Sequence, residues 1–235
     1  MTKHIFILPL EKVPTRYTQQ WYTEIPKRIM KECHNRNLRV AYMSTDHGYV
    51  EYINNGELVI SNPDITIVNV PGDLPEQTAT TGAFLNFAST NVWKSTQLAK
   101  FADLIHKGLV PRKSKVYITD AWNPAIIQIK YMSDLLDLDL ELHGQWHAGA
   151  HDPWDFLGRK IIDKRWPYAF ECSVFYALDK NYFTTEFYLN MFADTLGLDA
   201  KDPKFVRTGY PNEYLIDTLK PFRKPMKERK DIILF

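Results

Sequence analysis

The 235-residue sequence lacks the features that identify several common functional classes. It contains only two cysteines, Cys33 and Cys172, and no CxxC pair, which excludes a zinc ribbon or a thioredoxin-type site and predicts two buried free thiols in a reducing cytoplasm. Its 29 basic and 28 acidic side chains leave a net charge of +1, so no global attraction to nucleic acid or anionic lipid is indicated. No apolar run approaches the roughly 18 residues of a membrane span. We therefore expect a cytoplasmic protein with no membrane partner.

Several sequence motifs are also missing. There is no G-x-G-x-x-G, no Walker loop and no G-x-S-x-G elbow, so a dinucleotide site and a P-loop are not indicated and an α/β-hydrolase is disfavoured. The composition, by contrast, is that of a globular chain, with 45% hydrophobic and 24% charged residues. Aromatic residues reach 14%. We expect some of them to line a pocket rather than to fill the core.

Apolar patterning predicts strands that alternate with helices. Strands are expected at residues 3–10, 38–43, 65–70, 115–119, 138–143, 172–178 and 205–208, and a hairpin at 49–60. Helices are expected at residues 21–35, 92–106, 125–136, 153–164, 182–196 and 212–219. This alternation predicts an α/β fold, a Rossmann-like and mostly parallel sheet with helices on both faces.

Polar and aromatic residues follow most of the expected strands. Ligands of open parallel sheets bind at the carboxyl ends of the strands, so these positions are the candidate substrate-binding residues. They are Arg16, Tyr17, Thr18 and Trp21 after the first strand, Asp120, Trp122 and Asn123 after the fourth, Trp146, His147, His151 and Asp152 after the fifth, and Tyr210 after the seventh. A carboxylate such as Asp120 accepts hydrogen bonds from hydroxyls, and an indole such as Trp122 stacks on a sugar or base. Asp120 as a helix cap or turn former is an equal alternative.

The segment after the fifth strand contains three of the seven histidines. They are spaced at i, i+4 and i+8, which would align them on one helical face as metal ligands: His143, His147 and His151. Gly144 and Gly149 make a helix there unfavourable, and H-E-x-x-H is absent. The alternatives are a polar loop with one capping histidine, or a substrate-binding loop whose glycines permit close backbone approach.

The order of elements resembles the N-terminal, acceptor-side domain of GT-B glycosyltransferases of the retaining, family-4-like type. The segments that carry this resemblance are Leu140–His143, Val174–Phe192, Phe205–Pro211, Lys220–Lys230 and Ile232–Phe235. Further strings resemble bacteriophage glycosyltransferases, some of which are thought to modify DNA bases: Thr15–Trp21, Asn91–Leu98, Thr119–Pro124 and Trp146–Arg159.

The resemblance implies transfer of a sugar from a UDP- or GDP-sugar to a hydroxyl acceptor, with no required metal or other cofactor. The acceptor would be a saccharide, a protein or a hydroxymethylated base in phage DNA. A phage-encoded enzyme of this type would act in the host cytoplasm. His143 would be the catalytic residue that positions the transferred sugar, and Arg16 would stand in for a glycine-rich phosphate loop. Residues 1–219 would form the acceptor-side domain, 220–230 a basic linker and 231–235 the first strand of a second domain or subunit. We accordingly expect weak transferase activity, or none, from this chain alone.

Two other functions remain open. The first is a non-catalytic binding module or a partner subunit of a split enzyme. The second is a metal-dependent hydrolase that uses the three clustered histidines together with Asp152.

Overall fold

The computed structural model describes residues 2–13, 16–45, 62–75, 86–212, 214–225 and 228. The expected hairpin at residues 49–60 and the expected strand at residues 231–235 lie outside this part of the chain. Among the helices that are described, none is long and apolar enough to cross a membrane.

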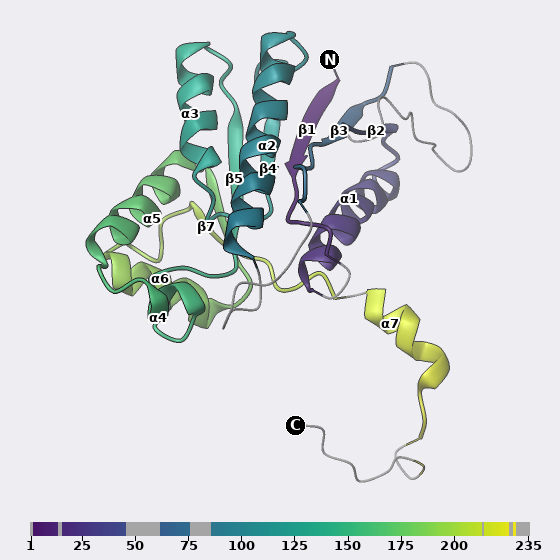
Figure 1. The fold of residues 1–235 in the computed structure, drawn as a ribbon. Helices are drawn as coiled ribbons and strands as arrows, with labels where there is room; N and C mark the ends of the chain where they lie inside the picture. The colour runs from purple at the N-terminus through teal and green to yellow at the C-terminus, as the bar shows by residue number, and fades with distance from the viewer. Residues whose placement is uncertain are drawn as a thin grey trace.

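In the described part of the chain, seven parallel strands form a single sheet (Figure 1). They are β1 (Lys3–Leu8), β2 (Val40–Ser44), β3 (Ile65–Asn69), β4 (Lys115–Ile118), β5 (Glu141–Trp146), β6 (Lys180–Phe183) and β7 (Phe205–Arg207). Their spatial order is β2-β3-β1-β4-β5-β6-β7. The fold is thus α/β and Rossmann-like, as the alternation predicts, with β2 and β3 exchanged relative to the usual dinucleotide-binding order.

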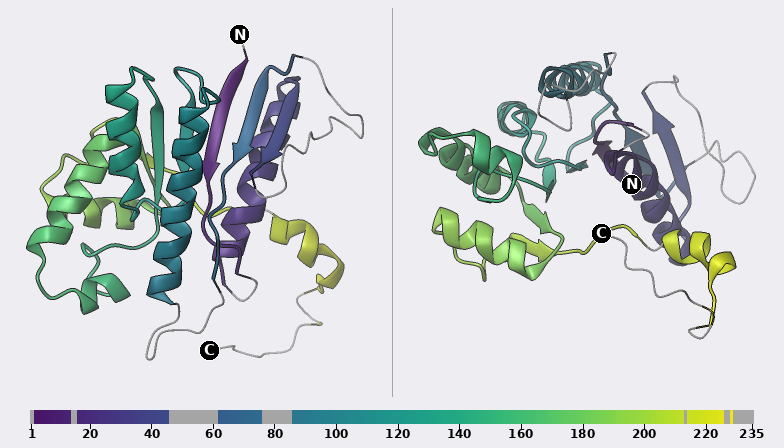
Figure 2. Two further views of the ribbon diagram at one scale, coloured as in Figure 1. Left: turned by 45° about the horizontal axis from the view of Figure 1, so that its top comes forward. Right: turned by 60° about the horizontal axis from the view of Figure 1, so that its bottom comes forward.

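The helices form two layers, one on each face of the sheet (Figure 2). Crossovers between parallel strands are right-handed, so the direction in which the chain moves across the sheet decides which face each helix covers. From β1 the chain moves towards the β2 edge, which places α1 (Thr18–Asn35) on one face. From β3 onwards it moves towards β7, which places the later helices on the opposite face. The second layer contains α2 (Phe87–His106), α3 (Ala125–Leu135), α5 (Arg165–Ala177) and α6 (Glu186–Leu196). Shorter helical segments are α4 (Phe156–Lys160), α7 (Tyr214–Leu219) and the 3-10 turn η1 (Lys220–Phe222).

Alternation along the strands divides the core between the two faces. Phe6 and Leu8 of β1 pack in the cluster under α2, α3, α5 and α6, whereas Ile7 packs with Cys33 of α1. Each such side chain contributes about 1.5–3 kcal/mol on burial. Both cysteines are free, but only Cys33 is buried and Cys172 is partly exposed.

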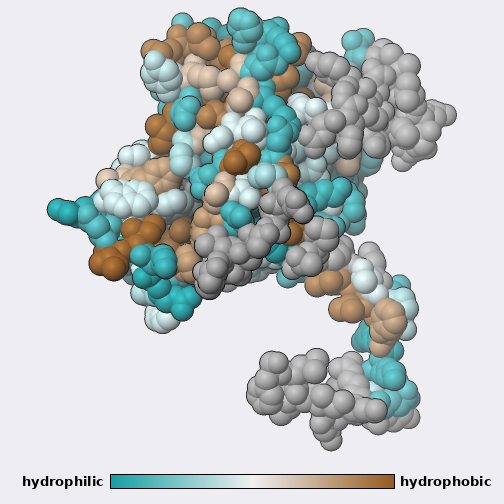
Figure 3. Space-filling model, viewed as in Figure 1, coloured by the Kyte–Doolittle hydropathy of each residue, from teal (hydrophilic) through white to brown (hydrophobic). Residues whose placement is uncertain are grey.

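The C-terminal helical segment lies apart from the sheet. In Figure 1, α7 extends away from the body of the domain, and Figure 3 shows apolar side chains on the surface of this segment. Ile216, Leu219 and Phe222 are all exposed.

Two expected elements in the second half of the chain are wrong. Residues 172–178 belong mostly to helix α5 rather than to a strand, because Glu171, Val174, Phe175 and Leu178 are buried at helical spacing. The strand in this part of the chain is instead the shorter β6, which includes the first residues of the helix expected at 182–196. That helix, α6, begins only at Glu186. A local run of apolar and aromatic residues suits either state, and its neighbours decide between them.

The segments on both sides of β5 also differ from expectation. Asp137 and Asp139 have positive φ angles of 51° and 52°, which interrupts an extended strand at 138–140. The strand therefore begins at Glu141 and ends at Trp146. The helix expected at 153–164 is limited to the five residues of α4.

Candidate functional site

A small crevice opens at the carboxyl ends of β1, β4 and β5. It has a volume of about 110 Å³, and it lies where the chain connections diverge from β1 and β4 to opposite faces of the sheet. This is the position at which open α/β sheets bind ligands. The polar and aromatic side chains that line it are Glu11, Arg16, Tyr17, Phe87, Thr90, Asn91, Lys94, Asp120, Trp122, His147, Asp155 and Phe156. Arg16, Tyr17, Asp120, Trp122 and His147 were predicted from the sequence.

Asp120 is fixed in the crevice by an ion pair with helix α2. Lys94 Nζ lies 2.7 Å from Asp120 Oδ2 and also donates to the backbone oxygen of Trp122 at 2.8 Å. The other carboxylate oxygen, Oδ1, accepts from the backbone N–H of Trp122 at 3.1 Å. Asp120 therefore acts as a turn former and also lines the crevice, so the two alternatives from the sequence are compatible.

The indole of Trp122 is held by a buried network behind the crevice. Its Nε1–H donates to Glu171 Oε1 at 2.7 Å, and the backbone N–H of Ala150 donates to the same oxygen at 2.6 Å. The second oxygen, Oε2, lies 3.1 Å from Nδ1 of His151. The side chains of His151 and Glu171 are fully buried. His151 therefore positions the wall of the crevice and does not line it.

His147 lies in the crevice as a neutral imidazole. Its Nε2 lies 2.7 Å from the backbone oxygen of Thr119. Because a carbonyl only accepts, Nε2 carries the proton and Nδ1 is the acceptor. Burial lowers the pKa of His147 and outweighs the attraction of Asp120. Trp21 packs edge-on against this imidazole, with ring centroids 4.4 Å apart.

Tyr17 contributes a protonated phenol to the same crevice. The residue is 45% exposed, but desolvation on the crevice side, reinforced by the negative charge of Asp120, raises the pKa of its phenol well above the ordinary value. Its ring lies 5.8 Å from that of His147. The phenol is thus a hydrogen-bond donor at neutral pH.

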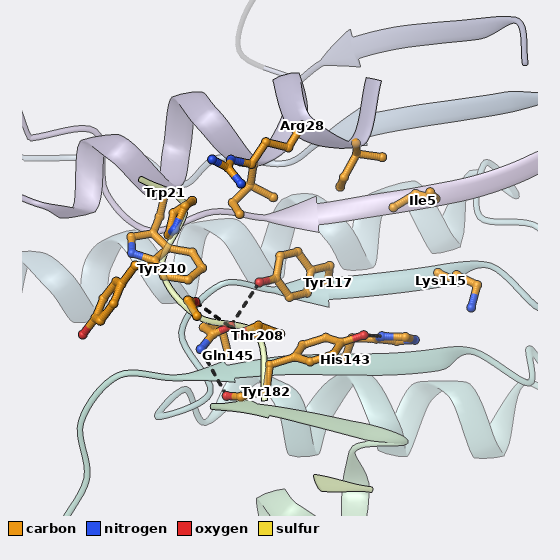
Figure 4. A pocket seen from close by; sticks show the side chains of 14 residues that line it. Ile5, Trp21, Arg28, Lys115, Tyr117, His143, Gln145, Tyr182, Thr208 and Tyr210 are labelled. Carbon is orange, nitrogen blue, oxygen red and sulfur yellow. Dashed lines mark hydrogen bonds between the residues drawn. The ribbon is translucent and has the colours of Figure 1, made fainter. Parts of the chain in front are cut away.

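His143 lies in a different cavity. This second cavity, of about 450 Å³, lies over the face of the sheet beside α1 (Figure 4). His143 occupies the middle of β5 rather than its end, so the expected strand-end position is wrong. Both ring nitrogens have partners: Nδ1 lies 2.6 Å from the Tyr182 hydroxyl and Nε2 lies 2.8 Å from Glu141 Oε1. A catalytic role for His143 stays a prediction, but the strand-end position from which it was inferred is not observed.

The polar groups of this sheet-face cavity mostly bind one another. Gln145 Nε2 donates to the backbone oxygen of Tyr182 at 3.2 Å, and its Oε1 accepts from Tyr117 at 3.5 Å. Trp21 and Tyr210 lie together at one end of the cavity, with ring centroids 6.4 Å apart (Figure 4). Because Trp21 also contacts His147, it lies between the two cavities.

Three further predicted residues have local structural roles. Trp146 is fully buried against Phe183, and its Nε1–H donates to Asn181 Oδ1 at 2.9 Å. Asn123 accepts from the backbone N–H of Ala125 at 3.0 Å, at the start of α3. Thr18 is buried in the first turn of α1.

The loop after β5 is held mainly by contacts within the protein. Asp152 Oδ1 accepts from the backbone N–H of Trp154 at 2.8 Å and thus forms a local turn. A side chain at Gly144 would clash with Leu178, and one at Gly149 would clash with His151 and Glu171. The close approach made by these two glycines is therefore to neighbouring side chains.

Glu11, Lys94 and Asp155 line the crevice but were missed from the sequence. Burial raises the pKa of Asp155, whose Oδ1 caps α4 by accepting from the backbone N–H of Leu157 at 2.8 Å. Lys94 lies within a helix, where a single lysine is usually a solvated surface residue. Glu11 follows β1 by three residues, and this position was the only available signal.

The described residues do not form a metal centre of three or more His, Cys, Asp or Glu side chains. The three clustered histidines bind separate partners: Glu141 and Tyr182, the Thr119 carbonyl, and Glu171. No protein-family model matches the chain, and no curated protein matches it.

Proposed function

We propose that the chain is the acceptor-side domain of a glycosyltransferase, which binds a UDP- or GDP-sugar and a hydroxyl acceptor in the crevice at the carboxyl ends of β1, β4 and β5. The observation that carries the proposal is the pairing of an oriented carboxylate with an oriented indole. Lys94 holds Asp120, and Glu171 holds Trp122, at the wall of one crevice. Carboxylates accept hydrogen bonds from sugar hydroxyls, and indoles stack on the apolar face of a sugar ring.

The charges of the crevice also suit a nucleotide-sugar. Lys94 and Arg16 supply positive charge for a diphosphate, beside the acidic groups that suit hydroxyls. The resemblance of the segments around Arg16 and Asp120 to bacteriophage glycosyltransferases supports the same reading. A second domain or subunit would complete the site, as the resemblance implies.

The proposed reaction needs a group that accepts a proton. The acceptor oxygen bonds to the anomeric carbon, the bond from that carbon to the diphosphate oxygen breaks, and the nucleoside diphosphate leaves with the electron pair. The acceptor hydroxyl loses its proton. His147 suits this role because it is neutral and its Nδ1 carries a lone pair.

Binding measurements test the proposal directly. The purified chain is titrated by calorimetry with UDP-glucose and GDP-mannose. Asp120→Asn should weaken the preferred donor by about 10-fold or more, because it removes a charged hydrogen-bond acceptor. Asp134→Asn is the matched control, since Asp134 is exposed on α3 and lies outside the crevice.

Failure of the wild-type chain to bind either donor, or equal affinities of Asp120→Asn and Asp134→Asn, would overturn the proposal. Thermal melts of the three proteins show whether a loss of affinity reflects unfolding. The acceptor class is tested with oligonucleotides that contain a hydroxymethylated or an unmodified base. Preference for the hydroxymethylated base that weakens with added salt would favour DNA, and no binding at low salt would exclude it.

A further inference from the structure

Glu11 enters the crevice from a loop that is held firmly in place. The loop follows β1, and the backbone N–H of Leu10 donates to Thr119 Oγ1 at 2.7 Å. Two side chains of α2 donate to the backbone oxygen of Pro9: Trp93 Nε1 and Gln97 Nε2, both at 2.9 Å. The backbone on the N-terminal side of Glu11 is therefore fixed against both the sheet and α2.

The carboxylate of Glu11 is buried and lacks a hydrogen-bond partner. The residue is only 1% exposed, and neither Oε1 nor Oε2 has a partner in the described part of the chain. The Lys94 ammonium, which lines the same crevice, donates instead to Asp120 and to the Trp122 carbonyl. An unpartnered buried carboxylate costs folding free energy, so its presence here calls for an explanation.

The surroundings of Glu11 indicate what it binds. It lines the crevice together with a phenol, an indole, two carboxylates and two cationic side chains: Tyr17, Trp122, Asp120, Asp155, Arg16 and Lys94. Its two oxygens need two donors that lie close together, and two adjacent hydroxyls on one ring meet this need. We propose that the Glu11 carboxylate accepts hydrogen bonds from a vicinal diol of the nucleotide-sugar, an inference that rests on the proposed function.

Two ring systems of a nucleotide-sugar carry such a diol, the hexose and the ribose. The nucleoside diphosphate without its sugar separates them, because it keeps the ribose and lacks the hexose. The probes are therefore the preferred donor, UDP-glucose or GDP-mannose, and the corresponding UDP or GDP.

Glu11→Gln tests the proposal by two measurements. The variant should bind the preferred donor about 10- to 100-fold more weakly, the range expected for a hydrogen bond to a charged group. Without ligand its melting temperature should rise by about 2–6 °C, because the neutral amide removes an unpaired buried charge. A residue that only supports the fold would give the opposite pattern, with a lower melting temperature and unchanged affinity.

Glu141→Gln is the matched control. Its carboxylate pairs with Lys115 at 2.6 Å and with His143 at 2.8 Å, two residues that line the sheet-face cavity, and Glu141 does not line the crevice. This variant should leave donor affinity unchanged and should not raise the melting temperature.

The outcomes separate this inference from the proposed function. If the wild-type chain binds none of the probes, both fail. If it binds the donor and Glu11→Gln binds equally well, only the role of Glu11 is wrong. A loss confined to the nucleotide-sugar assigns the diol to the hexose, and an equal loss with the nucleoside diphosphate assigns it to the ribose. Either loss supports the proposal.

Discussion

Replacement of Lys94 by methionine isolates the ion pair that holds Asp120 in the crevice. The Lys94 and Asp120 side chains are only 13% and 18% exposed, and Nζ lies 2.7 Å from Oδ2. Methionine keeps the length and the apolar character of the lysine stem but removes the charge. It also removes the hydrogen bond to the Trp122 carbonyl at 2.8 Å.

The expected cost follows from this burial. Removal of one partner from a fully buried pair costs about 3–5 kcal/mol, because an uncompensated charge remains, whereas an exposed pair is worth about 0–1 kcal/mol. The Lys94–Asp120 pair lies nearer the buried limit, so Lys94→Met should cost about 2–3 kcal/mol. For a chain of this size, this corresponds to a decrease of about 5–10 °C in melting temperature.

Lys130→Met is the matched control. Lys130 pairs with Asp134 at 2.6 Å, but the two side chains are 41% and 59% exposed and lie at i and i+4 on α3. This substitution should cost about 0.3–0.5 kcal/mol, and 0.5 M NaCl should abolish the difference because exposed pairs are screened. The cost of Lys94→Met should persist at the same salt concentration.

Urea denaturation at pH 7.5 measures these free energies of unfolding. The double variant Lys94→Met/Asp120→Asn should regain part of the loss, because no unpaired charge remains. The reasoning is refuted if Lys94→Met lowers the free energy of unfolding no more than Lys130→Met does. It is also refuted if the effects of Lys94→Met and Asp120→Asn on that free energy are simply additive in the double variant.

Two further predictions concern aromatic residues near the site. Trp146→Ala should lower the free energy of unfolding in urea by about 3–5 kcal/mol, because the indole is fully buried. The control Trp154→Ala, at a site 71% exposed, should change it by no more than about 0.5 kcal/mol. Similar costs for the two variants would refute the assignment of Trp146 to the core. Burial lowers the pKa of His147 below 6.5, so the unfolded chain binds its proton more readily, and the stability due to this residue is complete above about pH 6.5 and is lost as the pH falls below that value. The free energy of unfolding should therefore fall less between pH 7.5 and 5.5 in His147→Gln than in the wild type, and an equal fall would contradict the assignment.

The apolar pattern predicted much of the N-terminal half of the fold. Strands such as β1 and β3 are buried on both faces, so their residues form short continuous apolar runs. The C-terminal half was harder to predict. Residues 172–178 form such a run as well, but they end helix α5, because helical spacing lets Val174 and Phe175 face the core.

The sequence by itself determined that Arg16, Tyr17, Asp120, Trp122 and His147 share one edge, because parallel strands place their following loops together. The sequence could not determine where β5 begins and ends. A shift of the strand boundaries by a few residues moves His143 from the end of the strand to its middle, and so from the edge of the sheet to its face.

Only the tertiary structure placed Lys94 and Glu11 in the crevice. These residues come from a helix and a loop, and their burial depends on how α2 packs against the ends of β1 and β4. A charge pattern along the chain carries no information on which charge will find a partner, because pairing depends on distances set by packing. The pairing of Asp120 with Lys94, and the lack of a partner for Glu11, are therefore properties of the folded chain.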